Sequence, residues 1–108
     1  MEIRLLYHRE CPAWKEALEE LSAALRELEL GIDPALVEVR DDVDARKENL
    51  PGSPTILVDG EDLFPVPDPH YGLFCRIYLT EHGPRDHPTR GMIRKALDDR
   101  LAGKGQGG

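Results

Sequence analysis

A short apolar segment followed closely by a long amphipathic one constrains the fold of this chain more than any other feature. Residues 2–7 are largely apolar and bounded by charge, which predicts a buried strand. From Pro12 to about Leu30, apolar residues recur at spacings of three and four while charged residues fill the opposite face, and Gly31 follows as a C-terminal cap. The face that we expect to be buried comprises Trp14, Leu18, Leu21, Leu25 and Leu28. A strand that leads directly into such a helix favours an α/β fold.

The next segments continue the alternation of strand and helix. Residues 34–40 (PALVEVR) predict a second strand. Asp41 and Asp42 then offer N-cap side chains to a short helix that ends near residue 49. Turn residues follow, and the β-prone residues 55–58 predict a third strand.

The last part of the chain predicts a loop, a strand and a helix. Residues 61–72 contain three prolines and should form a loop, after which residues 73–79 (LFCRIYL) predict a fourth strand. A last helix should begin after Thr89, because five apolar residues share one face: Met92, Ile93, Ala96, Leu97 and Leu101.

These elements predict one α/β domain over residues 1–103, in the order β-α-β-α-β-β-α. We expect a four-stranded mixed sheet with helices on both faces, in which helical crossovers join parallel strands and the late strand at 73–79 is antiparallel. The glycine-rich residues 104–108 should form a disordered tail.

Charge and hydropathy exclude several classes of partner. The 108 residues carry 14 Lys and Arg against 21 Asp and Glu, a formal net charge of -7, whereas nucleic-acid binding needs clustered cations. No run approaches the roughly 20 apolar residues of a membrane helix, and no apolar stretch of signal-peptide length follows Met1. We therefore expect a cytoplasmic protein that binds neither nucleic acid nor membranes. In that compartment its two cysteines should be reactive or buried thiols rather than a secreted disulfide framework.

Cys11 stands where the first strand ends and the long helix begins. A helix N-terminus presents unpaired N–H groups and a partial positive charge, which stabilise a thiolate and lower the pKa of the thiol. Pro12 suits the first helical position, where its missing N–H would have had no partner. The junction thus predicts a reactive thiol at Cys11; the alternative is that Cys-Pro only starts the helix and that the thiol is buried and inert.

This Cys-Pro, together with Ser53-Pro54 directly before the third strand, resembles the thioredoxin-like superfamily and particularly its short glutaredoxin-like members. The resemblance covers about residues 2–102. It implies a thiol–disulfide oxidoreductase with Cys11 as the active-site thiol, a cis Pro54 that faces this thiol, and a substrate groove shaped by Ser53, Pro54 and Thr55. The substrate would be a thiol or disulfide of a small molecule or a protein. No cofactor is implied, and glutathione is the candidate co-substrate.

The chain departs from the dithiol members of that family, which have Cys-x-x-Cys where this sequence has Cys-Pro-Ala-Trp. A monothiol Cys11 would need an outside thiol or the only other cysteine, Cys75. Strand alternation places Cys75 on one face with Leu73, Ile77 and Leu79, as a core-facing small hydrophobe. An antiparallel fourth strand would also put Cys75 about 13 Å along the sheet from Pro54, at ~3.3 Å per residue, whereas a disulfide allows a Cα separation of only about 7 Å. We therefore expect Cys75 to be buried and distant from Cys11, and keep it only as a candidate second thiol.

Other polar and aromatic residues near Cys11 have two interpretations each. Trp14 could pack beside the thiol or fill the core. His8 could lower the pKa of the thiol when protonated, or donate a proton, or be a solvated loop residue. The remaining histidines lack the compact spacing of a zinc site, so we assign no metal: His70, His82 and His87.

A second functional class is a nonredox module that binds a partner protein, a thiophilic metal or an organomercurial through Cys11. The pattern GSPTILVDG followed by CRIY is similar to small thioredoxin-like proteins grouped by name with alkylmercury lyases. Lyase chemistry needs two thiolates and a proton source around one carbon–metal bond. The expected distance between Cys75 and Cys11 argues against that activity.

Overall fold

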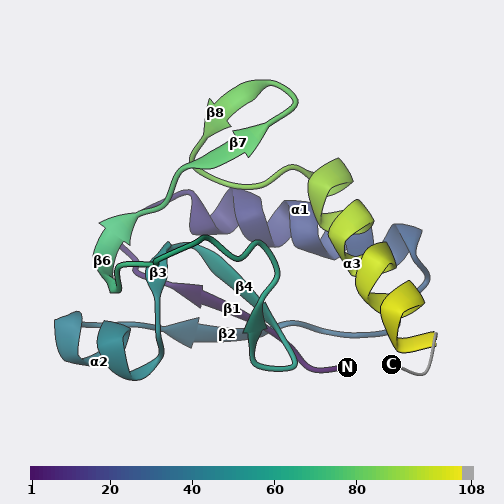
Figure 1. Ribbon diagram of the computed structural model, residues 1–108. Coiled ribbons are helices and arrows are strands. Elements are labelled where there is room, and N and C mark those ends of the chain that lie inside the picture. Colours follow the sequence, from purple (N-terminus) through teal and green to yellow (C-terminus); the bar gives the residue numbers. More distant parts are fainter. Residues whose placement is uncertain (106–108) are drawn as a thin grey trace.

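The computed structural model describes residues 1–105, and this part of the chain forms three helices and eight short strands (Figure 1). In chain order these are β1 (Ile3–Tyr7), α1 (Trp14–Glu27), β2 (Ala35–Glu38), α2 (Asp42–Lys47), β3 (Pro51–Ser53), β4 (Thr55–Val58), β5 (Glu61–Asp62), β6 (Gly72–Cys75), β7 (Tyr78–Thr80), β8 (Gly83–Arg85) and α3 (Arg90–Gly105). None of these helices is long and apolar enough to cross a membrane.

The main sheet has four strands in the order β2-β1-β4-β5, so the expected mixed four-stranded sheet is confirmed. β1 and β2 are parallel, as predicted, but β4 already runs antiparallel to β1. The expectation that the antiparallel strand is residues 73–79 is therefore wrong. The reason is the short connection after β2: α2 has six residues, about 9 Å of helix, and does not carry the chain back along the sheet. Thr55 consequently pairs with Leu6, near the end at which β1 finishes.

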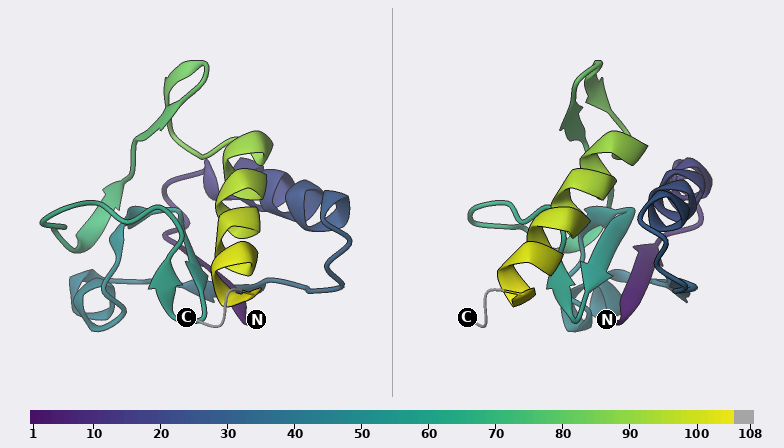
Figure 2. Two further views of the ribbon diagram at one scale, coloured as in Figure 1. Left: turned by 45° about the vertical axis from the view of Figure 1, so that its right-hand side comes forward. Right: turned by 90° about the vertical axis from the view of Figure 1, so that its right-hand side faces the viewer.

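Two hydrophobic clusters use alternate residues of the central strands. Leu5 and Ile56 contribute to a cluster with α1 and α3, and these two helices also pack against each other (Figure 2). The buried helical residues of this cluster are Ala17, Leu21, Ala24, Leu25, Ile93 and Leu97. The intervening residues Leu6 and Leu57 belong to a second cluster with Val39, Ala45 and Leu50. This division follows from the alternation of side chains along a strand.

The ends of the helices depend on local hydrogen bonds. Asp41 caps α2, where its carboxylate accepts the N–H of Asp44 at 2.8 Å, as predicted. α3 begins directly after Thr89, whose hydroxyl accepts the N–H of Met92 at 3.2 Å. α3 extends to Gly105, beyond the predicted start of the tail at residue 104; residues 106–108 lie outside the described part of the chain, so their disorder stays a prediction.

α1 begins at Trp14, later than predicted, so Pro12 does not occupy the first helical position. Residues 11–13 form a turn instead. The N–H of Trp14 lies 3.4 Å from the carbonyl of Cys11, and the N–H of Lys15 lies 3.2 Å from the carbonyl of Pro12. These bonds span three residues, so the turn is tighter than α-helix.

Residues 73–79 do not form one strand. β6 pairs in parallel with β3 in a small separate sheet, and β7 pairs with β8 in a hairpin that projects from the body (Figures 1 and 2). Arg76 and Tyr78 are buried, whereas Ile77 is 64% exposed and Leu79 80% exposed. Leu73 is half-buried against the second cluster, but from Cys75 onward the predicted apolar face is the outer one, because Arg76 and Tyr78 find polar partners inside and can be buried at little cost.

Candidate functional site

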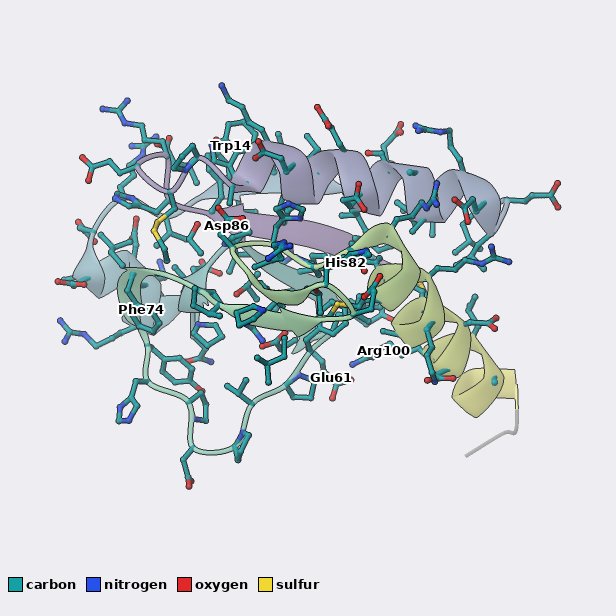
Figure 3. The ribbon with its side chains drawn as sticks, turned by 90° about the horizontal axis from the view of Figure 1, so that it is seen from above. Trp14, Glu61, Phe74, His82, Asp86 and Arg100 are labelled. Carbon is teal, nitrogen blue, oxygen red and sulfur yellow. A yellow bond between two sulfur atoms is a disulfide. The ribbon has the colours of Figure 1, made fainter. Side chains whose placement is uncertain are left out.

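The two cysteines form a disulfide, seen in yellow in Figure 3 beside the loop that leads into α1. Their Cα atoms are 5.8 Å apart, within the range of such bonds. This overturns the expectation that Cys75 is remote from Cys11. Because β6 runs parallel to β3, Cys75 pairs with Ser53 in register and lies beside the Ser53–Pro54 peptide.

The exposure of the two cysteines is the reverse of what the sequence suggested. Cys11 is buried, with 4% of its surface exposed, whereas Cys75 is exposed. A thiol that approaches from solvent therefore meets the Cys75 side of the bond.

Cys11 is held by the turn rather than by the helix itself. Its N–H donates to the carbonyl of His8 at 2.9 Å. The helix N-cap is Ala13, which offers no side-chain partner to the first N–H groups of α1. Cys11 thus lies just before a helix N-terminus that no side chain caps.

Ser53 connects the two cysteine-bearing segments. Its carbonyl accepts the N–H of Arg76 at 2.9 Å, directly after Cys75, and its hydroxyl accepts the N–H of His8 at 2.8 Å. The peptide between Ser53 and Pro54 is cis, as the resemblance implied. Ser53, Pro54 and Thr55 are fully buried, and Ser53 and Thr55 both bond to Arg76, directly after Cys75.

Gly52 allows β3 and β6 to approach closely, and sequence analysis missed this role. Its φ is +100°, and a Cβ on it would lie 2.9 Å from the Cβ of Arg76 and from the ring of Phe74. Its place directly before Ser53-Pro54 was the available signal. Another residue at position 52 would push β6, and with it Cys75, away from β3.

Arg76 is the second residue that sequence analysis missed, although an arginine inside a predicted core strand was a signal. Its side chain is buried and donates from Nη1 to the Thr55 hydroxyl at 3.0 Å and to Asp62 at 2.9 Å. Nη2 donates to the carbonyl of Phe64. The guanidinium also lies 4.6 Å from the centroid of the Tyr78 ring. Arg76 therefore joins its own segment to β4 and β5.

Tyr78 completes this network. Its hydroxyl donates to the carbonyl of Pro54 at 2.6 Å. Burial raises the pKa of the Tyr78 phenol, and the nearby Arg76 cation opposes that rise only in part. The phenol is thus neutral and serves as a hydrogen-bond donor.

The predicted supporting residues have other partners. Nδ1 of His8 lies 3.1 Å from the carbonyl of Val39, and Nε2 lies 3.4 Å from the Glu10 carboxylate. Trp14 is half-buried and stacks on Tyr7, with ring centroids 4.4 Å apart. Across residues 1–105, no three His, Cys, Asp or Glu side chains gather as they would around a metal ion.

A shallow polar hollow of about 370 Å³ adjoins the loop before Cys11. It is lined by His8, Arg9, Glu10, Glu38 and Arg40. Its two arginines are balanced by two carboxylates, and Nε of Arg40 lies 3.8 Å from the Glu38 carboxylate.

Comparisons of the sequence with models of protein families, with curated proteins and with solved structures find no match. Any assignment of function therefore rests on the residues themselves.

Proposed function

We propose that this chain is a cytoplasmic, thioredoxin-like thiol–disulfide oxidoreductase whose redox pair is Cys11 and Cys75. The observation that carries the proposal is the disulfide itself. It joins an exposed cysteine to a buried one in the turn before α1, next to Ser53–Pro54. Cys75 supplies the second thiol that the Cys-Pro-Ala-Trp motif lacks, so a dithiol mechanism replaces the monothiol one.

The arrangement of the elements supports a thioredoxin-like fold with helices on both faces of the sheet. The strand order is β2-β1-β4-β5, and α1 and α3 share one hydrophobic cluster. Ala45 of α2 belongs to the other cluster, which uses the alternate residues Leu6 and Leu57.

The proposed reaction begins at Cys75, the exposed residue of the pair. A substrate thiolate attacks Sγ of Cys75, and the Cys11–Cys75 bond breaks. A mixed disulfide forms between the substrate and Cys75. Cys11 leaves with the electron pair as a thiolate, which can take up a proton. A second substrate thiolate then attacks the substrate sulfur of the mixed disulfide and releases Cys75. The protein disulfide and two thiols thus become the protein dithiol and one substrate disulfide. The reverse sequence reduces a disulfide.

Two features favour exchange over a purely structural bond. Cytoplasmic thiols are kept reduced, so a disulfide in that compartment is usually transient and catalytic. The leaving sulfur, Cys11, lies just before the N-terminus of α1, where a thiolate is stabilised. Glutathione is the proposed co-substrate, as the family resemblance implies.

The test compares the wild type with Cys11→Ser and Cys75→Ser. We expect both variants to lose at least about 90% of the rate at which the protein catalyses glutathione-dependent reduction of a small disulfide, because each removes half of the pair. With oxidised glutathione, Cys11→Ser should form a mixed disulfide at the exposed Cys75, and Cys75→Ser should form one about tenfold more slowly at the buried Cys11. Mass spectrometry under nonreducing conditions gives both rates.

Two outcomes contradict the proposal. Full activity of Cys75→Ser would restore the monothiol mechanism. A wild-type disulfide that persists in excess reduced glutathione would indicate a structural bond.

The proximity of the two sulfurs also favours the second candidate, binding of a thiophilic metal or an organomercurial by the reduced pair. Phenylmercuric ion should then bind the reduced wild type in a one-to-one ratio and dissociate more slowly from it than from either single serine variant. Equal dissociation rates would argue against chelation by the pair.

A further inference from the structure

We propose that Arg76 is a positioning residue that holds Cys75 opposite Cys11 after the disulfide opens, and so sets the redox equilibrium of the pair. The inference rests on the proposed redox role of the pair and gives that site a residue that controls it. Arg76 acts through the backbone of its neighbour and is not itself a catalytic residue.

The segment that carries Cys75 is attached to the body before and after Arg76, and Leu73 packs against the second hydrophobic cluster. Its strand β6 pairs only with the three-residue β3, and the register shifts between Pro51 and Ser53. Near the start of β6, Gly72 donates to Leu50 at 3.0 Å, and the N–H of Leu73 lies 3.4 Å from a carboxylate oxygen of Asp42. Beyond Arg76, the buried Tyr78 donates to the carbonyl of Pro54 at 2.6 Å, and the chain then continues into the projecting hairpin (Figure 1). Among these attachments, Arg76 is the one directly next to Cys75, so it holds Cys75 most closely once the disulfide has opened.

Arg76 attaches this segment both to β3 and to the four-stranded sheet. Its backbone N–H donates to the carbonyl of Ser53, and its side chain bonds to β4 at Thr55 and to β5 at Asp62. None of these contacts involves a sulfur atom, so all of them can persist in the dithiol form.

Movement of Cys75 away from Cys11 would break these contacts at a cost. Asp62 has a side chain only 16% exposed and would lose its cation, and the fully buried Thr55 hydroxyl would lose a donor. Leaving a buried charge or polar group without its partner is unfavourable by more than the bond itself contributes. The reduced Cys75 therefore stays near Cys11, and its effective concentration toward Cys11 is high.

The experiment measures the equilibrium constant between the protein disulfide and reduced glutathione in anaerobic redox buffers, by alkylation and mass spectrometry. The key variant is the double substitution Arg76→Met and Asp62→Leu, which removes both charges and leaves no buried carboxylate without a partner. We expect the equilibrium to shift toward the dithiol by about tenfold or more in this variant, and by about threefold in Arg76→Lys, because a higher effective concentration favours the closed ring.

The matched control is Arg94→Met, which removes a 2.9 Å ion pair with Glu27 on α1 and should leave the constant unchanged. A folded double variant with the wild-type constant would overturn the proposal. If the double variant does not fold, the proposal is tested with Arg76→Lys alone. An equilibrium constant equal to that of the wild type in Arg76→Lys would then also overturn the proposal.

The redox equilibrium constant of Cys11 and Cys75 can be measured whether or not the protein catalyses the reaction of a substrate. If glutathione does not exchange with the wild type, the proposed function fails. The role of Arg76 is then measured in dithiothreitol buffers with the same variants.

Discussion

The buried hydroxyl of Tyr78 couples the stability of the molecule to pH at the scale of a single residue. It donates to the carbonyl of Pro54 at 2.6 Å, and burial raises its pKa above the ordinary value of about 10. Because the folded-state pKa is raised, the stability that Tyr78 contributes is complete below about pH 10 and is lost as the pH rises further. In that range the unfolded chain ionises the phenol while the folded chain does not.

We therefore predict that Tyr78→Phe removes part of the alkaline destabilisation. Above about pH 10, Tyr78 should reduce the wild-type free energy of unfolding by up to about 1.4 kcal/mol per pH unit, and the variant should lack this component. At pH 7 the variant should be less stable by about 1–2 kcal/mol, because the Pro54 carbonyl loses its donor. Urea unfolding between pH 7 and 11 measures both effects.

Tyr71→Phe is the matched control, because the side chain of Tyr71 is exposed. Parallel stability curves for the wild type and Tyr78→Phe would contradict this account of Tyr78.

At the scale of elements, the contact between β3 and β6 places Cys75. Gly52 allows that close contact. Its φ is +100°, and a Cβ at this position would clash with Arg76 and Phe74. Ser53 then bonds to the segments of both cysteines. The pairing of these two short strands therefore determines whether a disulfide can form.

Gly52→Ala should destabilise the oxidised protein by about 2–4 kcal/mol, which combines backbone strain with a clash against Arg76 and Phe74. It should also slow closure of the disulfide, because Cys75 is displaced. Chemical unfolding and the rate of thiol loss in oxidised glutathione provide the two measurements.

Gly60→Ala separates the two causes. Gly60 has a φ of +83° but nothing within 4 Å of an added Cβ, so this control carries only the backbone strain. Equal effects of the two substitutions on disulfide closure would show that the close approach at Gly52 is unimportant.

On the scale of the whole molecule, the disulfide joins residues 64 positions apart. It ties the segment that carries the projecting hairpin to the turn before α1 (Figure 3). Neither hydrophobic cluster contains a cysteine, so the packing of the sheet against its helices does not depend on the bond. The reduced protein should consequently remain folded.

Reduction should nevertheless lower the free energy of unfolding, by about 4 kcal/mol for a loop of this length, because the unfolded chain regains conformational freedom. Urea unfolding with and without dithiothreitol measures the difference. The double variant Cys11→Ser and Cys75→Ser should be insensitive to the reductant. A wild type equally insensitive to it would show that the bond does not form in solution.

Much of the fold was predictable from the sequence because it depends on local patterns. The three- and four-residue spacing of α1, the Asp41 cap of α2 and the run of β4 each lie within a few neighbouring residues. The place of Cys11 before a helix was predictable for the same reason, whereas the cis peptide at Ser53-Pro54 was implied only by the family resemblance.

The position of Cys75 was decided only by the tertiary structure. The alternation of side chains along residues 73–79 defines two faces but does not show which face is buried. The more apolar face was predicted to be buried, and that prediction is wrong from Cys75 onward. Arg76 and Tyr78 form the inner face. Their burial is favourable only because hydrogen-bond partners lie 14 to 24 residues away in the sequence; these are Asp62, Thr55 and Pro54. A polar side chain can be buried where distant groups satisfy it, and such partners are brought together only when the chain has folded.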